Sequence, residues 1–237
     1  MKWAEEFLAQ LKAPLDFFSW HRYACFPAKI STRAAETRAL LDKYGFTETE
    51  SILNEWNYVR GWTGDDWLYS LRNEKGLKGA SFISSIMCDS QNGLVDLLMY
   101  YDARPCGMNG MFSTDFVCDK LKGYYPFLMF NRLYTLGNAV EVSSDDEQVH
   151  LCAASGEGEY AVFLTYFDDD DAAPSKELSV DLTGISPSAN GVSLDVYLLD
   201  GTHDCELVSS SVLFGNRLTW KTTASNLSSY LLKLKAL

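Results

Sequence analysis

The stretch SILNEWNYV, residues Ser51–Val59, begins with apolar residues and ends with polar ones. Ser51–Leu53 is typical of a short buried strand, and Asn54–Asn57 places a carboxylate, two amides and an indole where that strand ends. A strand end is held rigidly by its hydrogen-bond ladder and opens onto loops, so functional side chains are often found there. An ordinary solvated Glu suits the same position, and the sequence on either side must therefore separate the two interpretations.

Two further predicted strands also end in polar residues. Leu15–Trp20 predicts a strand that runs into His21-Arg22-Tyr23, and Leu94–Tyr101 predicts a strand that ends at Asp102. Near-continuous apolar strands that alternate with helices predict a parallel sheet covered by helices. The predicted helices are Trp3–Lys12, Ser31–Tyr44 with Ser31 as the N-cap and Gly45 as the stop signal, and Asp66–Cys88 with a break near Gly76.

The shared position of these polar clusters suggests a catalytic face. In a (β/α)₈ barrel the active site lies at the carboxyl ends of the strands. Retaining glycoside hydrolysis uses one carboxylate as the nucleophile and one carboxylic acid about 5–5.5 Å away. Glu55 is placed to be such a nucleophile, Tyr23 to keep it ionised by a hydrogen bond, and His21 to bind a sugar hydroxyl. The other predicted substrate-binding residues at these strand ends are Trp56, Asn57, Tyr101 and Asp102.

Each candidate also has an ordinary structural interpretation. Glu55 alone is typical of a surface carboxylate at a strand end, and His21 alone of a core or rim histidine. Packing explains Tyr23 and Trp56, and an ion pair with a loop arginine explains Asp102. The functional interpretation is favoured because polar clusters recur at the same end of three consecutive strands.

The pattern changes after residue 137. A loop covers 103–119, and Lys122–Tyr134 predicts a helix that Gly137 ends. From Asn138 onward, short alternating segments follow one another with turn residues between them, which predicts an antiparallel β-sandwich. The expected fold is therefore α/β plus all-β, with a partial barrel over 1–137 and a sandwich over 138–237. The Asp168–Asp171 run lacks EF-hand spacing, which favours a solvated turn over a calcium site.

Composition excludes several classes of function. The 237-residue chain is 47% hydrophobic and carries a net charge of −12, with a pI of about 4.6. Such acidity repels phosphate backbones, so we expect no nucleic-acid partner. The six cysteines show no CxxC spacing, so neither a metal site nor a redox motif is predicted. Reduced thiols and the lack of a signal-like start predict a cytoplasmic protein, and no apolar run is long enough for a membrane span.

The ordered series of segments resembles the last third of the barrel in family 39 glycoside hydrolases, the β-xylosidase and α-L-iduronidase relatives. The resemblance implies that Glu55 is the nucleophile at the end of strand seven, and that His21 and Tyr23 on strand six line the sugar subsite. Trp56 and Asn57 would shape the surroundings of the nucleophile. The matching segments are DFFSWHRY (16–23), ILNEWNY (52–58), LLMYYDAR (97–104), NGMF (109–112) and KGYYPFLMFNRLYTLG (122–137).

The sequence also departs from that family. The family's general acid is the Glu of an Asn-Glu pair on strand four, and strands one to five have no counterpart here. Asn73-Glu74 does not replace it, because it falls in a predicted loop or helix start. We therefore expect a hydrolase portion that keeps the nucleophile, needs no cofactor, and is weak or inactive alone.

Three parallel strands also cannot close an eight-stranded barrel, and their open edges predict a homodimer or pairing with a separate N-terminal barrel half. Two alternatives remain from the residues. One is a non-catalytic carbohydrate-binding or interaction protein, and the other is an enzyme that recruits Asp102 as its acid.

Overall fold

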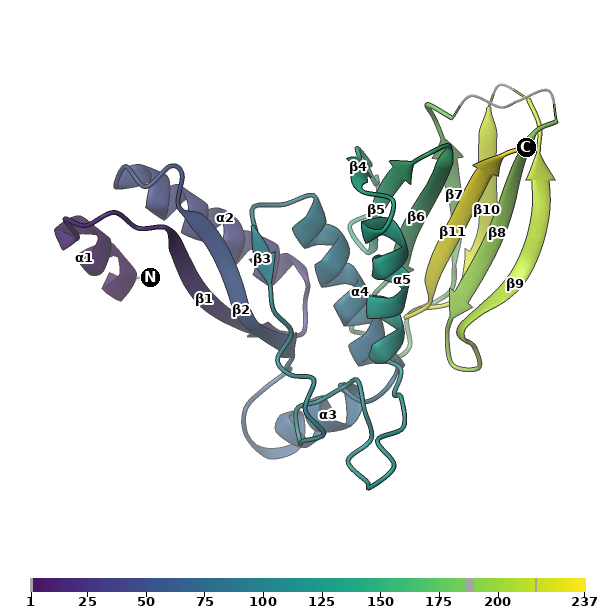
Figure 1. The fold of residues 1–237 in the computed structure, drawn as a ribbon. Coiled ribbons are helices and arrows are strands. Elements are labelled where there is room, and N and C mark those ends of the chain that lie inside the picture. The colour runs from purple at the N-terminus through teal and green to yellow at the C-terminus, as the bar shows by residue number, and fades with distance from the viewer. Residues whose placement is uncertain (1, 186–189, 216) are drawn as a thin grey trace.

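A three-stranded parallel sheet carries the ends of the predicted strands. The computed structural model describes residues 2–185, 190–215 and 217–237 (Figure 1). Its parallel sheet has the order β1-β2-β3, and both pairings are parallel as predicted. The bounds are Phe17–Ala24 for β1, Glu50–Tyr58 for β2 and Leu97–Leu98 for β3.

The pairing of β1 with β2 contains a bulge next to Glu55. Trp20 lies opposite Leu53, whereas His21 lies opposite Glu55, so Asn54 is the extra residue on β2. A bulge bends its strand and re-aims the side chains that follow it. Glu55 thereby comes to lie beside His21 at the ends of the two strands.

The third strand is much shorter than the predicted Leu94–Tyr101. Only two residues form a regular ladder, although the backbone N–H groups of Asp96, Met99 and Tyr101 still donate to carbonyl groups of β2. The Asp96 carboxylate accepts the backbone N–H of Ser51 at 2.7 Å. A side chain therefore occupies a donor of β2 at this edge, and the regular ladder is confined to the two residues of β3.

Five helices are found among the described residues. The second helix begins at Ala28 after Pro27, so the predicted N-cap Ser31 lies inside the helix instead. Proline pre-sets a helical φ angle and needs no N–H partner, which makes Pro27 the stronger start signal. The predicted break near Gly76 is confirmed. The bounds are α1 Lys2–Gln10, α2 Ala28–Lys43, α3 Gly64–Asn73, α4 Leu77–Gln91 and α5 Tyr124–Tyr134.

The chain after α5 forms two antiparallel sheets. A six-stranded sheet has the order β4-β5-β6-β11-β8-β9, and a two-stranded sheet pairs β10 with β7. Apolar side chains from both sheets share one buried cluster. The bounds are β4 Asn138–Val140, β5 Val149–Gly156, β6 Glu159–Tyr166, β7 Lys176–Leu182, β8 Val192–Leu199, β9 Asp204–Leu213, β10 Leu218–Ala224 and β11 Ser229–Ala236.

Helices α4 and α5 lie between the parallel sheet and the six-stranded sheet (Figure 1). Cys88 of α4 and Met129 of α5 are fully buried in one cluster with Phe163 of β6 and Leu231 of β11. Segments 1–137 and 138–237 thus share a buried core. The boundary between two domains at this point stays a prediction.

The Asp168–Asp171 run does not form the solvated turn that its composition suggests. Asp169 is only 9% exposed and accepts hydrogen bonds from Tyr58 at 2.5 Å and from Arg60 at 3.1 Å. The ammonium group of Lys78 donates to its backbone oxygen at 2.6 Å. The solvated-turn prediction is therefore wrong for Asp169, which ties the antiparallel part of the chain to β2 and α4.

Two searches of the described residues returned nothing. No cluster of three or more His, Cys, Asp or Glu side chains could hold a metal ion there. Among the described helices, none combines the length and the apolar character that crossing a membrane would require.

Candidate functional site

Glu55, Tyr23 and His21 meet at the ends of β1 and β2. The Tyr23 hydroxyl donates to Glu55 Oε2 at 2.9 Å, and His21 Nδ1 lies 3.3 Å from the same oxygen. The Glu55 side chain remains 31% exposed. Glu55 Oε1 has no hydrogen-bond partner in the described part of the chain. One carboxylate oxygen is thus held in place while the other is free to react.

Tyr23 is a hydrogen-bond donor over the whole physiological pH range. Its burial, followed by its hydrogen bond to Glu55, raises the pKa of Tyr23 well above the usual value for tyrosine. The phenol therefore keeps its proton and continues to donate to Glu55. A donor of this kind stabilises the ionised form of the carboxyl group, which is the form a nucleophile needs.

Aromatic rings surround Tyr23. The Tyr101 ring lies 6.4 Å from the Tyr23 ring at 85°, and the Trp62 ring lies 5.1 Å from it at 77°. Trp62 in turn stacks on Trp67 at 5.4 Å. The sequence analysis did not single out these two tryptophans as site residues. Their signal is a pair of Trp residues five positions apart, directly after the strand that carries Glu55.

Asn57 is fully buried and holds the chain after β3 against β2. Its Nδ2 donates to the backbone oxygen of Tyr101 at 2.9 Å and to that of Met108 at 2.7 Å. The same nitrogen lies 3.2 Å from the hydroxyl of Tyr100. These bonds give Asn57 the role of positioning Tyr101 beside Tyr23, and no part of its side chain is open to a ligand.

Trp56 lies in the apolar core. It is 0% exposed, and its ring packs against Tyr100 at 5.3 Å and against Phe82 of α4 at 6.5 Å. The structure does not bring Trp56 together with the Glu55 group. Its burial leaves no surface for a ligand, in contrast to the direct substrate contact that its position in the sequence suggested.

Asp102 is held by Arg104. Its carboxylate accepts the Arg104 backbone N–H and Nε at 3.0 Å each, and Nη2 at 2.6 Å. Burial raises the pKa of Asp102, but the hydrogen bonds from Arg104 outweigh it and leave that pKa below its usual value. Asp102 is therefore ionised at neutral pH and has no proton to donate, which fits the ion-pair interpretation.

Glu74 is a buried carboxyl group without a partner. It lies between α3 and α4, is 0% exposed, and neither of its carboxyl oxygens has a hydrogen-bond partner. Burial raises the pKa of Glu74 to about 8, so the group carries a proton at neutral pH. Gly110 packs so closely here that an added Cβ would lie 2.3 Å from the Glu74 backbone oxygen and 2.8 Å from the Tyr100 hydroxyl. Sequence reasoning placed Glu74 in a loop and saw no chemistry in it.

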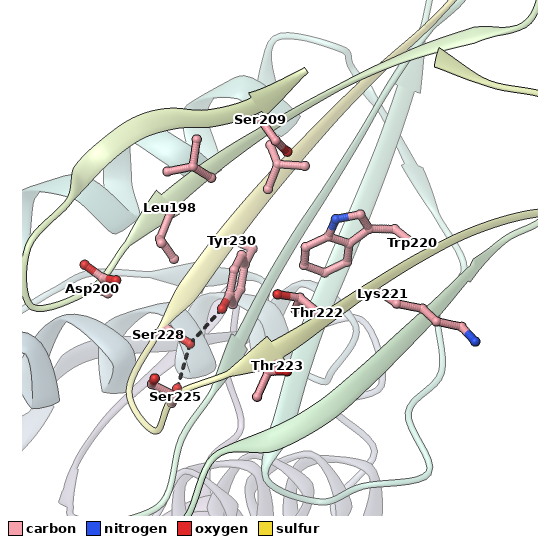
Figure 2. A pocket seen from close by; sticks show the side chains of 12 residues that line it. Leu198, Asp200, Ser209, Trp220, Lys221, Thr222, Thr223, Ser225, Ser228 and Tyr230 are labelled. Atoms are coloured by element: carbon pink, nitrogen blue, oxygen red, sulfur yellow. Dashed lines mark hydrogen bonds between the residues drawn. The ribbon is translucent and has the colours of Figure 1, made fainter. Parts of the chain in front are cut away.

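A separate hollow of about 330 Å³ lies on the antiparallel sheets. Trp220, Thr222 and Tyr230 point toward one another there, whereas Lys221 points away (Figure 2). The rings of Trp220 and Tyr230 are 5.3 Å apart. None of the predicted site residues lines this hollow, and the candidate site is therefore the Glu55 group.

Comparison with solved structures relates this fold to enzymes that cleave glycosidic bonds. A glucosidase from Croceicoccus marinus superposes with a TM-score of 0.76 at 18% identity, over 100% of this chain and 57% of its own. The GH39 enzyme from Xanthomonas axonopodis pv. citri gives 0.69 at 16% identity, over 98% and 57%. A GH30 endoxylanase from Clostridium papyrosolvens C71 gives 0.63 at 12% identity, over 93% and 49%.

These likenesses confirm, at the level of the fold, the resemblance to family 39 glycoside hydrolases. The chain spans about half the length of the structures that it matches. No protein-family model matches the sequence, and no curated protein matches it.

Proposed function

We propose that this chain is the nucleophile-bearing portion of a retaining glycoside hydrolase of the xylosidase type, with Glu55 as the nucleophile. The observation that carries the proposal is the Glu55 carboxylate, whose Oε2 is held by Tyr23 while Oε1 stays free. On this view the parallel sheet corresponds to strands six to eight of an incomplete (β/α)₈ barrel. The two antiparallel sheets form the β-sandwich that follows it.

The proposed chemistry proceeds in two steps. Glu55 Oε1 attacks the anomeric carbon of a bound sugar, and the bond from that carbon to the leaving oxygen breaks. A covalent glycosyl–Glu55 intermediate results, which water then hydrolyses with retention of configuration. His21 and Tyr101, which adjoin Tyr23 and Glu55, contribute hydrogen bonds to the sugar hydroxyls. Side chains and water complete these steps, so the proposal assigns no part to a metal or an organic cofactor.

Protonation of the leaving oxygen needs a second carboxyl group. Asp102 is ionised by its contacts with Arg104, and Glu74 keeps its proton but is fully buried. Neither group combines a proton with access to a ligand. We propose that the acid belongs to a separate chain that completes the barrel, and that this chain alone is weakly active at most.

Burst kinetics with an activated substrate test this function. The dinitrophenolate of a 2,4-dinitrophenyl β-xyloside or β-glucoside leaves without being protonated, so its release does not require the missing acid. We expect a burst of about one dinitrophenolate per chain followed by very slow turnover, because the second step also lacks its base. The Glu55→Gln variant is expected to lose the burst, and a burst that survives this substitution would remove Glu55 from the mechanism.

A second candidate is a non-catalytic carbohydrate-binding protein. The exposed aromatic side chain of Trp62 beside Tyr23 favours it, because such a ring suits a sugar face whether or not a bond is cleaved. Calorimetry that detects oligosaccharide binding, together with no dinitrophenolate burst, would support this candidate over the hydrolase. In the structure all six cysteines are free thiols, which supports the predicted cytoplasmic location.

A further inference from the structure

The loop between β2 and α3 presents an exposed indole beside the Glu55 group. Trp62 is 57% exposed even though its ring is stacked on Trp67 and touches the edge of Tyr23. Tyr23 is the residue that donates to Glu55. The exposed ring is therefore one aromatic side chain removed from the predicted nucleophile.

Several contacts fix this loop before any ligand binds. The Arg60 backbone N–H donates to Ser70 of α3 at 2.9 Å, and the Arg60 guanidinium lies 3.8 Å above the Tyr69 ring. Gly61 approaches α3 so closely that an added Cβ would lie 2.8 Å from the Cβ of Asp66. A surface that is ordered in advance loses little entropy on binding, which raises the affinity available from a given contact area.

The chemistry of this surface matches a neutral sugar. A pyranose ring has an apolar C–H face and a rim of hydroxyls, so it combines contact with an indole face and hydrogen bonds to neighbouring polar groups. Asp65 and Asp66 begin α3 beside Trp67, and the whole chain carries a net charge of −12. This negative charge disfavours acidic sugars such as uronates.

We infer that Trp62 and Trp67 form a stacking platform for a second sugar unit, next to the unit that lies at Glu55. The ligand is a neutral oligosaccharide of at least two pyranose units. The order of the two units rests on the proposed function of Glu55, whereas stacking on Trp62 does not require any cleavage. The platform therefore predicts that affinity depends on chain length.

Isothermal titration calorimetry with xylotetraose, cellotetraose, xylose and tetragalacturonate tests the platform. We expect both neutral tetrasaccharides to bind more tightly than xylose, and tetragalacturonate to bind more weakly. Trp62→Ala is expected to weaken tetrasaccharide binding about tenfold or more, as is typical of a central tryptophan at an interface. Xylose binding is expected to be unchanged by this substitution.

Matched variants keep the test specific. Trp3 is 72% exposed and stacks on Phe7 in α1, far from α3 in Figure 1, so Trp3→Ala removes a similar exposed ring and is expected to bind as wild type does. Trp62→Tyr keeps an aromatic face and is expected to retain part of the affinity. If Trp62→Ala binds the tetrasaccharides as tightly as wild type, or if Trp3→Ala loses as much affinity, the platform is contradicted.

The platform and the hydrolase proposal fail separately. The dinitrophenyl glycosides carry a single sugar, so their burst reports on Glu55 and not on Trp62. Trp62-dependent tetrasaccharide binding without a burst would uphold the platform and contradict the nucleophile. A burst combined with tetrasaccharide binding that ignores Trp62 would do the reverse.

Discussion

The two oxygens of Glu55 have different surroundings, and this difference predicts the effect of removing Tyr23. Tyr23→Phe deletes the donor to Oε2 and keeps the ring that contacts Trp62 and Tyr101. A hydrogen bond to a charged group contributes about 1.5–3 kcal/mol, so we expect the dinitrophenolate burst to slow by roughly 10- to 100-fold. The exposed Tyr134 supplies the control, because Tyr134→Phe leaves the Glu55 group untouched. Equal burst rates for the two variants would contradict the role of Tyr23.

Glu74 predicts an unusual pH dependence of stability. Burial raises its pKa from 4.5 to about 8 in the folded state. Between these values the unfolded chain loses the proton while the folded chain keeps it, so the free energy of unfolding falls as the pH rises from 4.5 to 8. Below this window the group costs nothing, and above it the cost is constant.

The Glu74→Gln variant measures that cost. The amide does not titrate, so we expect the variant to gain stability over wild type progressively from pH 4.5 to pH 8, by a few kcal/mol in total. Urea unfolding at several pH values gives the difference. Glu48 is exposed, and Glu48→Gln should show no such trend. A difference between Glu74→Gln and wild type that stays constant with pH would show that Glu74 is not held protonated.

At the level of elements, Asn57 joins β2 to the chain that follows β3. Asn57→Ala removes two hydrogen bonds to backbone oxygens, at 2.9 and 2.7 Å, and leaves those oxygens unpaired. We expect a loss of about 2–3 kcal/mol in the free energy of unfolding. Hydrogen exchange should speed up in residues 99–112 while β5 and β6 keep their protection. Uniform loss of protection in both regions would contradict a local tie.

The parallel pairing of β1 and β2 and the meeting of His21, Tyr23 and Glu55 could be predicted from the sequence. Apolar runs alternating with helical segments set the direction of those strands, and their polar ends then had to lie together. The bulge at Asn54 could not be predicted, because it depends on which residues of β1 face which residues of β2. A shift of one residue changes which side chains face inward.

Three other features needed the packed structure. The burial of Trp56 depends on Phe82, which lies in a helix some distance along the chain. The regular ladder of the third strand is shorter than predicted, because the Asp96 side chain takes a backbone donor of β2. Glu74 is an ordinary acidic residue in the sequence, and only its enclosure between α3 and α4 makes it unusual.

For the whole molecule, the parallel sheet has two open edges. Both β1 and β3 pair only with β2, and Phe17, Leu97 and Met99 beside these edges are each more than 40% exposed. Open edges with apolar side chains tend to pair with another chain. We therefore expect the purified chain to sediment as a dimer at micromolar concentration in analytical ultracentrifugation.

Two variants separate this edge from other exposed apolar side chains. Phe17→Lys places a charge at the edge of β1 and is expected to shift the chain to a monomer. Phe214 is 68% exposed beside the antiparallel sheets, and Phe214→Lys is expected to remain a dimer. A monomeric wild type at every concentration, or a dimer that only Phe214→Lys disrupts, would contradict association through the parallel sheet.

The most direct test of the central claim is to map a covalent sugar adduct on the protein. A 2,4-dinitrophenyl 2-deoxy-2-fluoro-β-xyloside or β-glucoside forms the glycosyl intermediate but slows its hydrolysis, so the adduct accumulates. We predict that peptide mass spectrometry finds one sugar per chain, attached to Glu55, and none on Glu55→Gln. An adduct on Asp102 or any other residue, or no adduct at all, would contradict the assignment of Glu55 as the nucleophile.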